Sequence, residues 1–595
     1  MKPLDSEDSK RLFFGRVFRS EDDCAPQYEE VSTQILKKCG GLPLAIITIA
    51  SLLASRQAKS RSDWESIVNS LGTNFATDPT LEGMKNILNL SYMHLPPRLR
   101  ACFLYLGLYP EDREIERDDL ARQWVAEGFV SNVPGLDLED VAKSYFNELI
   151  NRSMIQPAET IYGEVSSCRV HDMILDLILS KCAEENFIHT AHSHGEMEKM
   201  HSCKYKVRRL CLNLSAGGAT PWSTLATGLS QVRSFAQFGE SIHAPALESF
   251  KHVRVLVFEV SGKWRSKLGA ICHLFQLRYL KVSAQRVELP AEIRGLVHLK
   301  TLEMNCWSGS EISSDIVHLP NLFHLLLPHD TGLPEGIRNM TSIRTLRCSS
   351  MEKSSVEDIT GLGELTNLRD LSLSVCYGES LTVEGVDALV SSIGKLRDLR
   401  ELYLDCHLKK YKDQLDSLPD PPSRLEVLNL KYWSFYVVPK WICGLRYLRS
   451  LSLTVTDLST DELRVLGELP SLVHANFTVL RIPEDKIVVG SGSFPVLEEI
   501  SLISNEDVAA YMRFEAGAMP SVRALGFKFA VQEWSGCTPD GMEHLLGLEQ
   551  VKLHLKITAG TKHGQAEQVI PDVSSAYSKA MEVHPRRPTF ALKRI

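Results

Sequence analysis

The segment LRELYL, residues 399–404, shows the pattern that decides the fold of the larger part of this chain. Leucines stand at its first, fourth and sixth positions, and the residues between them are polar or aromatic. The alternation over ELYL is that of a short strand with one buried face. The same pattern recurs clearly in LRYLKV (277–282), LKTLEM (299–304), LFHLLL (322–327), LRDLSL (368–373), LEVLNL (425–430), LRSLSL (448–453) and LEEISL (497–502).

The spacing of these copies indicates a repeat array. Weaker copies start at Val207, Val232, Val253, Ile343, Leu472, Val522 and Leu548, which makes fifteen starts with a mean spacing of about 24 residues. One copy cannot bury its leucines alone, so stacked copies share a core behind a parallel sheet. We therefore predict a solenoid of α/β leucine-rich repeats over 207–575, followed by a tail at 576–595. The segment 382–395 has a helical pattern, and we expect an inserted helix there.

The first 200 residues have a helical rather than a strand period. Apolar residues from Leu138 to Ile150 recur three and four positions apart, which predicts an amphipathic helix. Further helices are expected at 99–106, 120–129 and 172–183, with a hairpin at 154–170. Helices followed by a two-stranded wing are typical of a winged-helix domain.

The chain is thus expected to be a multi-domain α+β protein. We expect a helical segment at 1–90, a winged helix at 91–190, a linker at 191–206 and then the repeats. Around the linker the sequence holds His189, His192, His194 and His201 beside Cys203. Because the stretch is polar and turn-like, we interpret these residues as solvated and predict no metal site.

Composition and charge narrow the class of protein. The 595 residues are 44% hydrophobic and 24% charged, as in an ordinary globular protein, and the net charge is −8. Between Glu111 and Glu148 there are 11 acidic and 4 basic residues, which argues against nucleic-acid binding. The longest apolar stretch, 42–54, has 13 residues, too few for a membrane span. The 14 cysteines include no C-x-x-C pair and the N-terminus resembles no secretory leader, so we expect a reducing, cytoplasmic location.

Five segments, in their order along the chain, carry a resemblance to a known family. They are PLDSEDSKRLFFGRVF (3–18), CGGLPLAI (39–46), ACFLYLGLYPED (101–112), LARQWVAEGFV (120–130) and RVHDMILDLI (169–178). Together with the repeats they resemble the plant NB-ARC leucine-rich-repeat (NLR) disease-resistance proteins, whose GLPLA and MHD motifs correspond to the second and the last segment. The resemblance implies a receptor of plant innate immunity, acting in defence and the hypersensitive response, and not an enzyme.

The sequence departs from the family pattern at the nucleotide-binding lobe. No G-x-x-x-x-G-K-[ST] segment occurs, since the Gly262-Lys263 and Gly394-Lys395 pairs are followed by Trp and Leu. No apolar strand ends in paired acids that would hold magnesium. The family implies ADP or ATP, but we expect this chain to bind either nucleotide weakly or not at all. We interpret the chain as beginning within the NB-ARC region, as a truncated product or an incomplete gene model, with a remnant of the switch.

The resemblance also implies roles for two short segments. In the GLPLA motif, Gly41, Leu42 and Pro43 lie against the nucleotide, with the proline on its base and sugar. In the MHD motif, His171 reaches the β-phosphate of ADP and Asp172 orients the turn. A helix that begins at residue 172 fits these roles, because helix N-termini favour anions.

Exposed positions of the repeat strands are expected to select the partner, since they can vary without loss of core packing. The candidates in the C-terminal half are Arg400, Glu401, Tyr403, Glu426, Asn429, Arg449, Ser452, Glu498 and Glu499. An aromatic cluster at Tyr432, Trp433, Phe435 and Tyr436 serves either as an interface anchor or as packing. The resemblance implies that the partner is a pathogen effector or a modified host protein. Other NLR chains are further candidates, and any association with the plasma membrane would be through partners.

Other functions remain open at this point. An adaptor or decoy would use the repeats to regulate other receptors without nucleotide switching. A nucleotide-hydrolysing switch needs the lysine and the magnesium acid that the sequence lacks, and an extracellular receptor needs a leader. A ubiquitin-ligase adaptor needs an F-box-like segment, whereas residues 1–190 carry the motifs quoted above.

Overall fold

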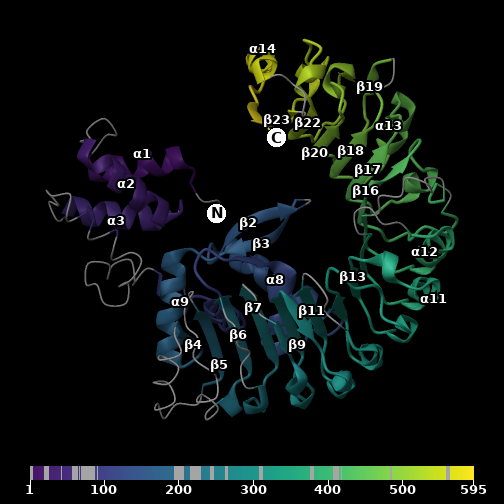
Figure 1. The fold of residues 1–595 in the computed structure, drawn as a ribbon. Helices are drawn as coiled ribbons and strands as arrows, with labels where there is room; N and C mark the ends of the chain where they lie inside the picture. The colour runs from purple at the N-terminus through teal and green to yellow at the C-terminus, as the bar shows by residue number, and fades with distance from the viewer. Residues whose placement is uncertain are drawn as a thin grey trace. The chain divides into compact units, whose positions relative to one another are not determined.

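The computed structural model describes residues 4–18, 26–41, 43–55, 64–65, 68, 88–89, 92–161, 163–192, 207–214, 229–240, 247–261, 265–306, 312–375, 381–405, 414–416, 418–482, 485–557 and 563–594. The chain divides into two compact units (Figure 1). The first comprises Met1–Gln285 with His298–Thr301, and the second comprises Arg286–Val297 with Leu302–Ile595.

Three helices open the first unit: α1 (Ser6–Val17), α2 (Pro26–Cys39) and α3 (Pro43–Ser55). The Asp5 side chain caps α1 by accepting the Asp8 amide at 2.7 Å. After α2 come Gly40 and Gly41, whose φ angles of 53° and 71° are ones that glycine adopts without strain. α3 begins at Pro43, because the first position of a helix tolerates proline.

A winged-helix domain follows in the same unit, as the sequence predicts. Its helices are α6 (Pro97–Tyr105), α7 (Arg117–Glu127), α8 (Leu138–Asn151) and α9 (Asp172–Glu185). Its strands are β1 (Glu114–Glu116), β2 (Gln156–Ile161) and β3 (Glu164–Arg169), which pair antiparallel in the order β1-β3-β2. The apolar face of α8 is buried, which agrees with its helical period.

The first repeats also belong to the first unit. Parallel strands run in the order β4 (His189–Ala191), β5 (Arg209–Leu214), β6 (Ser234–Glu240), β7 (Val255–Ser261) and β9 (Tyr279–Ala284). The sheet therefore begins before residue 207, where the sequence places the first repeat. His189 lies in β4, whereas His194, His201 and Cys203 lie outside the described residues.

The second unit continues with parallel strands. They are β11 (Thr301–Cys306), β12 (His324–Leu326), β13 (Thr345–Cys348), β14 (Asp370–Ser374), β15 (Glu401–Asp405), β16 (Val427–Phe435), β17 (Ser450–Val455), β18 (His474–Val479), β20 (Glu499–Ile503), β22 (Ala524–Ala530), β23 (Gln550–Lys556) and β24 (Thr589–Arg594). The register keeps the leucines in line, since Leu371, Leu402 and Leu428 pair in succession and are all buried. In Figure 1 three helices lie along the outer side of this curved sheet: α11 (Val356–Gly361), α12 (Val383–Lys395) and α13 (Thr460–Leu466). α12 is the inserted helix that the sequence predicts.

The C-terminal segment corrects one expectation. Residues 576–595 are not a tail, because β24 pairs in parallel with β23 and α14 (His563–Val583) precedes it. The Tyr577 ring is fully buried and stacks on Phe590, with 5.3 Å between the ring centroids. The repeat array therefore extends to residue 594. With this change, the predicted α+β chain with an α/β repeat solenoid is confirmed.

Within the described ranges, no helix combines the length and the apolar character needed to cross a membrane.

Candidate functional site

His171 lies at the turn before α9 and is 9% exposed. Its Nδ1 accepts the Met173 amide at 3.2 Å, which makes the side chain the cap of that helix. Burial lowers the pKa of His171, although the Asp172 carboxylate and the nearby Cys39 backbone oppose the shift. Because Nδ1 accepts a hydrogen bond, the proton of the neutral ring lies on Nε2.

The His171 ring packs on the glycine turn after α2. A Cβ built on Gly40 would lie 2.4 Å from Cδ2 of the ring, so only glycine fits at this position. Gln156 of β2 donates to the Gly40 carbonyl at 3.2 Å, which ties the wing to the same turn. The two motifs predicted for the nucleotide site thus meet, and Gly40, which is not among the predicted site residues, makes the contact between them. The double glycine in CGGLPLAI was the available signal for a close approach of another chain segment.

The other predicted residues of this site have different surroundings. Gly41 is buried, and its carbonyl accepts the Leu4 amide at 2.8 Å. Pro43 is half-buried at the start of α3, Asp172 is the first residue of α9, and Leu42 lies outside the described residues.

Asp176 lies one turn beyond Asp172 on α9. Burial raises its pKa to about 6, and the charges of Glu111 and Asp172 add to the shift, while Lys38 of α2 opposes it. Ionised Asp176, close to the His171 turn, therefore destabilises the folded chain relative to its protonated form.

A second site lies where the winged helix meets the first repeats. Glu127, the last residue of α7, has a fully buried side chain. Arg209 of β5 donates to both of its oxygens, at 2.9 and 3.2 Å, and the Ser234 hydroxyl of β6 donates to one of them. Arg254 donates to the Glu127 backbone carbonyl at 3.1 Å, which satisfies the end of the helix. The end of α7 is thus fixed to three consecutive repeats.

Asp119, two turns earlier on α7, makes the corresponding contacts further along the sheet. It accepts from the Tyr279 hydroxyl and from Lys281 of β9, the latter at 2.8 Å. Burial acts to raise the pKa of Asp119, but Lys281 and the hydrogen bonds hold it below its usual value. Lys281 also lies 3.2 Å from Glu259 of β7, which pairs with Arg113 in turn. Acidic and basic side chains therefore alternate from Asp119 through Lys281 and Glu259 to Arg113, and both the winged helix and the repeats contribute an acid and a base.

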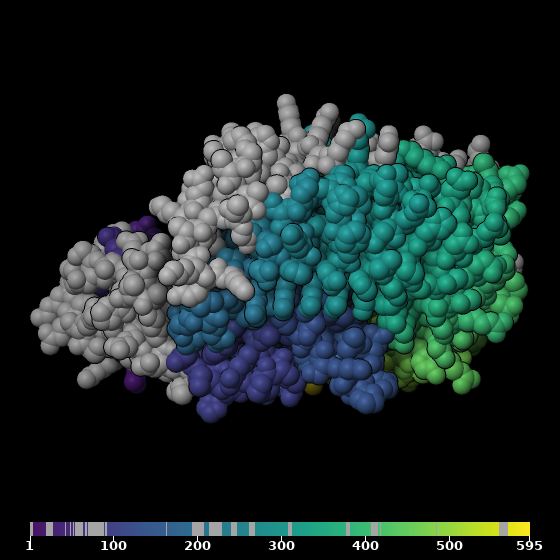
Figure 2. Space-filling model, turned by 90° about the horizontal axis from the view of Figure 1, so that it is seen from below, coloured from purple at the N-terminus to yellow at the C-terminus, as the bar shows by residue number. Residues whose placement is uncertain are grey.

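Apolar contacts surround this network. The Tyr109 and Phe238 rings lie 5.9 Å apart, and the Arg209 guanidinium lies 4.1 Å from the centroid of the Phe187 ring. In Figure 2 the indigo winged-helix residues lie directly against the blue repeats of the same unit. The outward positions of these first strands are thus covered by the chain itself.

This second site was not predicted from the sequence. Asp119 was interpreted only as an acid in the first turn of a helix, where the helix dipole favours it. The spacing of Asp119, Gln123 and Glu127, four residues apart, places all three on one face of α7, beside the buried Leu120 and Trp124. That polar stripe was the available signal for a buried partner rather than solvent.

The candidate partner-binding residues lie on the second unit, on and just before its strands. Glu401, Tyr403 and Asn429 are half-buried on β15 and β16, and Tyr403 pairs with Asn429 in the register. Before the strands lie Arg400, Glu426, Arg449 and Glu498, of which Arg400 and Glu426 form an ion pair at 3.8 Å. Ser452 is only 7% exposed, so it contributes little surface. Glu499 pairs with His474 on the adjacent strand β18 and with Lys552 on β23, which lies beyond β22.

The aromatic cluster divides into two kinds of residue. Trp433 and Phe435 are 1% and 0% exposed, so they belong to the core, and the interpretation of Trp433 as an anchor for a partner is wrong. Tyr432 and Tyr436 are 39% and 59% exposed and remain accessible. The cause is a register shift in β16 between Leu430 and Ser434, which turns the following odd-numbered residues inward.

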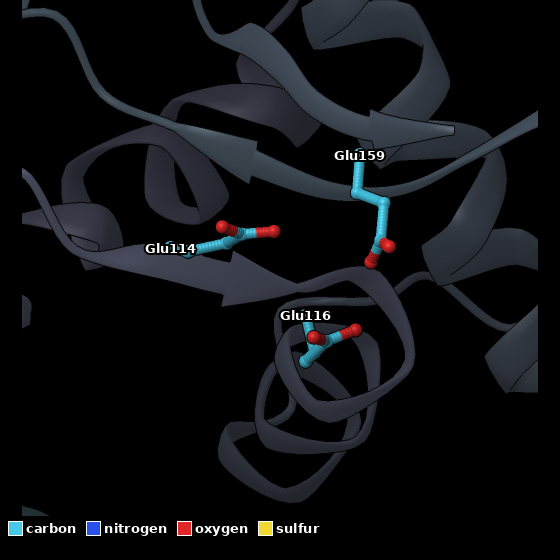
Figure 3. Close-up of side chains that lie close together, drawn as sticks. All are labelled: Glu114, Glu116 and Glu159. Atoms are coloured by element: carbon cyan, nitrogen blue, oxygen red, sulfur yellow. The ribbon is translucent and has the colours of Figure 1, made fainter. Parts of the chain in front are cut away.

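Three carboxylates gather on the wing, where Glu114, Glu116 and Glu159 place oxygens within 4.8 Å of one another (Figure 3). Glu114 is already engaged, since it accepts from the Ser167 hydroxyl and from Arg169, the latter at 3.0 Å. These hydrogen bonds lower the pKa of Glu114, whereas burial raises that of Glu116. The group is an exposed acidic cluster, and nothing in it points to a metal ion.

A winged helix packed against leucine-rich repeats places the chain among multi-domain leucine-rich-repeat proteins. The family model described as "Leucine-rich repeat region" matches residues 231–590, and the model "Disease resistance protein Winged helix domain" matches residues 108–178. The chain belongs to the plant NB-ARC leucine-rich-repeat disease-resistance family, and the resemblance found in the sequence is confirmed.

Named relatives agree with this assignment. Disease resistance protein RGA5 of Oryza sativa subsp. japonica is 38% identical over 98% of this chain and 53% of its own length. Disease resistance protein Pik-2 of the same organism is 30% identical over 94% of this chain and 60% of its own length. The chain thus spans between about half and three-fifths of these relatives. A solved leucine-rich-repeat protein of Leptospira interrogans covers 64% of this chain and 98% of its own, at 18% identity and a TM-score of 0.43.

Proposed function

We propose that this chain acts in plant disease resistance as the sensing and coupling part of a cytoplasmic immune receptor. The strands of the second unit bind a pathogen effector or a modified host protein. The network between the winged helix and the first repeats holds the resting arrangement. Its loss is the signal that passes to the nucleotide-binding part of a receptor. Similarity to disease resistance proteins supports the immune role.

The observation that carries the coupling role is the burial of charge at Glu127 and Asp119. Burying a carboxylate is expensive, and breaking one partner of a buried pair leaves that cost uncompensated. A buried ion pair is either intact or broken, with few intermediate arrangements. It therefore suits a switch better than an exposed ion pair, which can loosen gradually. A partner that displaces the first repeats would therefore release the winged helix in one step.

The test places this chain behind the nucleotide-binding lobe and signalling domain of a close relative. Glu127→Gln keeps the shape of the side chain but removes the charge that Arg209 binds, so it should cause cell death in leaves without any partner. Glu148→Gln, on the exposed pair with Arg98, is the matched control and should remain silent. If Glu127→Gln is also silent while expressed at the wild-type level, the coupling role is wrong.

The second candidate function is an adaptor or decoy that regulates other receptors without nucleotide switching. The lack of a G-x-x-x-x-G-K-[ST] segment in this sequence favours it, because that segment is the loop that binds the phosphates of a nucleotide. Calorimetric titration of the full chain with ADP separates the two. No measurable binding supports the decoy, whereas sub-micromolar affinity, about −8 kcal/mol or better, supports a working remnant of the switch.

A further inference from the structure

The last three strands of the sheet carry adjacent basic side chains. Lys528 of β22, His554 of β23 and Lys593 of β24 are successive partners in the parallel register, and we call them the basic row. Since neighbouring strands lie about 4.8 Å apart, the three side chains stand next to one another. The preceding residues Phe527 and Leu553 are buried, so the basic row lies on the face away from the core.

The basic row has no counter-charge in the part of the chain that the structure describes. None of its three residues forms an ion pair there. Burial and the positive charges of Lys528, Lys593 and Lys552 together lower the pKa of His554. The local potential is therefore positive, although the whole chain carries a net charge of −8.

The same face already holds one carboxylate. Lys552 of β23 lies 3.0 Å from one oxygen of Glu499 on β20, and His474 of β18 lies 3.8 Å from the other. Lys552 reaches across β22, where Gly526 is its partner in the register and offers no side chain in the way. The His474 imidazole and the Lys552 ammonium together hold the pKa of Glu499 at about 2, against the effect of burial. Basic side chains on this face of the sheet thus already bind one carboxylate of the same chain.

We propose that the basic row is the docking surface for an acidic polypeptide segment of a partner protein, whose carboxylates bind between Lys528, His554 and Lys593. The inference rests on the proposed function and specifies the chemistry of the partner. A nucleic acid fits less well, because specific binding commonly uses about six to ten phosphate contacts.

His554 makes this docking depend on pH. The groups that face it are Lys528 on one neighbouring strand, Lys593 on the other and Lys552 on its own strand, all positive. Bound carboxylates favour the protonated imidazole, so binding takes up a proton wherever the free chain holds His554 neutral. Affinity therefore rises as the pH falls from about 7.5 to about 6, where an imidazole titrates.

The experiment measures binding of a fluorescent oligo-glutamate peptide to the full chain by anisotropy, in roughly 50 mM salt so that screening does not hide the effect. Lys528→Gln with Lys593→Gln should weaken binding about tenfold, since each exposed charge pair contributes up to about a factor of five. The matched control is Lys440→Gln with Lys579→Gln, which removes the same charge from exposed positions outside the basic row and should change affinity less than twofold. His554→Gln should still bind the peptide but lose the tightening at low pH.

Three results would overturn the inference. They are no binding of the peptide by the wild-type chain, an equal loss in the control pair, and tighter binding of a single-stranded oligonucleotide than of the peptide. None of them bears on cell death caused by Glu127→Gln, so the inference and the proposed function fail separately. A glutamine peptide of the same length should not bind.

Discussion

Arg209 on β5 holds the buried Glu127 carboxylate at the end of α7 with two guanidinium nitrogens, at 2.9 and 3.2 Å. The pair joins the winged helix to the first repeats across 82 residues of chain. Everything that we propose about coupling depends on this contact and on the neighbouring pair of Asp119 and Lys281.

Loss of the arginine should destabilise the first unit strongly. Arg209→Met removes the partner but keeps much of the apolar stem, so Glu127 stays buried with little compensation. We expect a loss of about 3–5 kcal/mol in the free energy of unfolding. Arg98→Met breaks the exposed pair with Glu148 and should cost less than about 1 kcal/mol. Chemical denaturation of the full chain measures both, and equal losses would contradict the burial of charge at Glu127.

The glycine turn beneath His171 permits a matched pair of substitutions. Gly40→Ala introduces both a left-handed backbone conformation for alanine and a clash with the imidazole ring. Gly135 has a φ of 82°, and no atom lies within 4 Å of the place that a Cβ would take there, so Gly135→Ala introduces the backbone strain alone. We expect about 1–2 kcal/mol for Gly135→Ala and a clearly larger loss for Gly40→Ala. Equal losses in thermal unfolding would show that His171 does not pack on this turn.

Stability should depend on pH through Asp176. Its pKa is about 6 in the folded chain and about 3.8 when unfolded, so the folded state binds the proton more tightly. The stabilisation is full below the unfolded pKa and is lost as the pH rises from about 3.8 to about 6. Asp176→Asn should therefore stabilise the chain by about 1–2 kcal/mol above pH 6, a figure reduced for solvent screening of a half-buried group. The gain should shrink toward pH 4, and a gain that is the same at both pH values would contradict the assignment.

The aromatic residues of β16 should separate stability from binding. Trp433→Ala removes a buried ring and should cost about 3–5 kcal/mol in the free energy of unfolding. Tyr436→Ala removes an exposed ring and should change stability by less than about 0.5 kcal/mol. Denaturation curves for both variants test this, and comparable losses would mean that the register shift in β16 is wrongly placed.

Much of the fold could be predicted because repeated leucines impose a strand and a register. Leu402 and Leu428 lie side by side in the sheet, as their equivalent positions in the repeat indicate. The cap of α9 could also be predicted, since a polar residue before an apolar helical run is a helix start. In both cases a local pattern determines the structure.

The remainder depends on contacts between distant segments. Nothing near Trp433 in the sequence indicates an irregular register. Three extra residues, 431–433, lie between the partners of Leu453 and Thr454, and an odd number of extra residues reverses which side chains face the core. The pairing of Glu127 with Arg209, and the contact of His171 with Gly40, join segments 82 and 131 residues apart. A charged residue in a helix is expected to face solvent unless its partner is known. The sequence therefore indicates which charged residues lie on a helix but not which residues they pair with.

The most direct test of the account exchanges residues between this chain and a relative that recognises a different partner. Within a full receptor, only the outward residues of β14 to β23 are exchanged, including Glu401, Tyr403 and Asn429, while every buried leucine stays. Recognition, measured as partner-dependent cell death, should move with the exchanged residues, and the melting temperature should hardly change. If recognition instead follows residues 1–190, the strands of the second unit are not the sensor and the account is wrong.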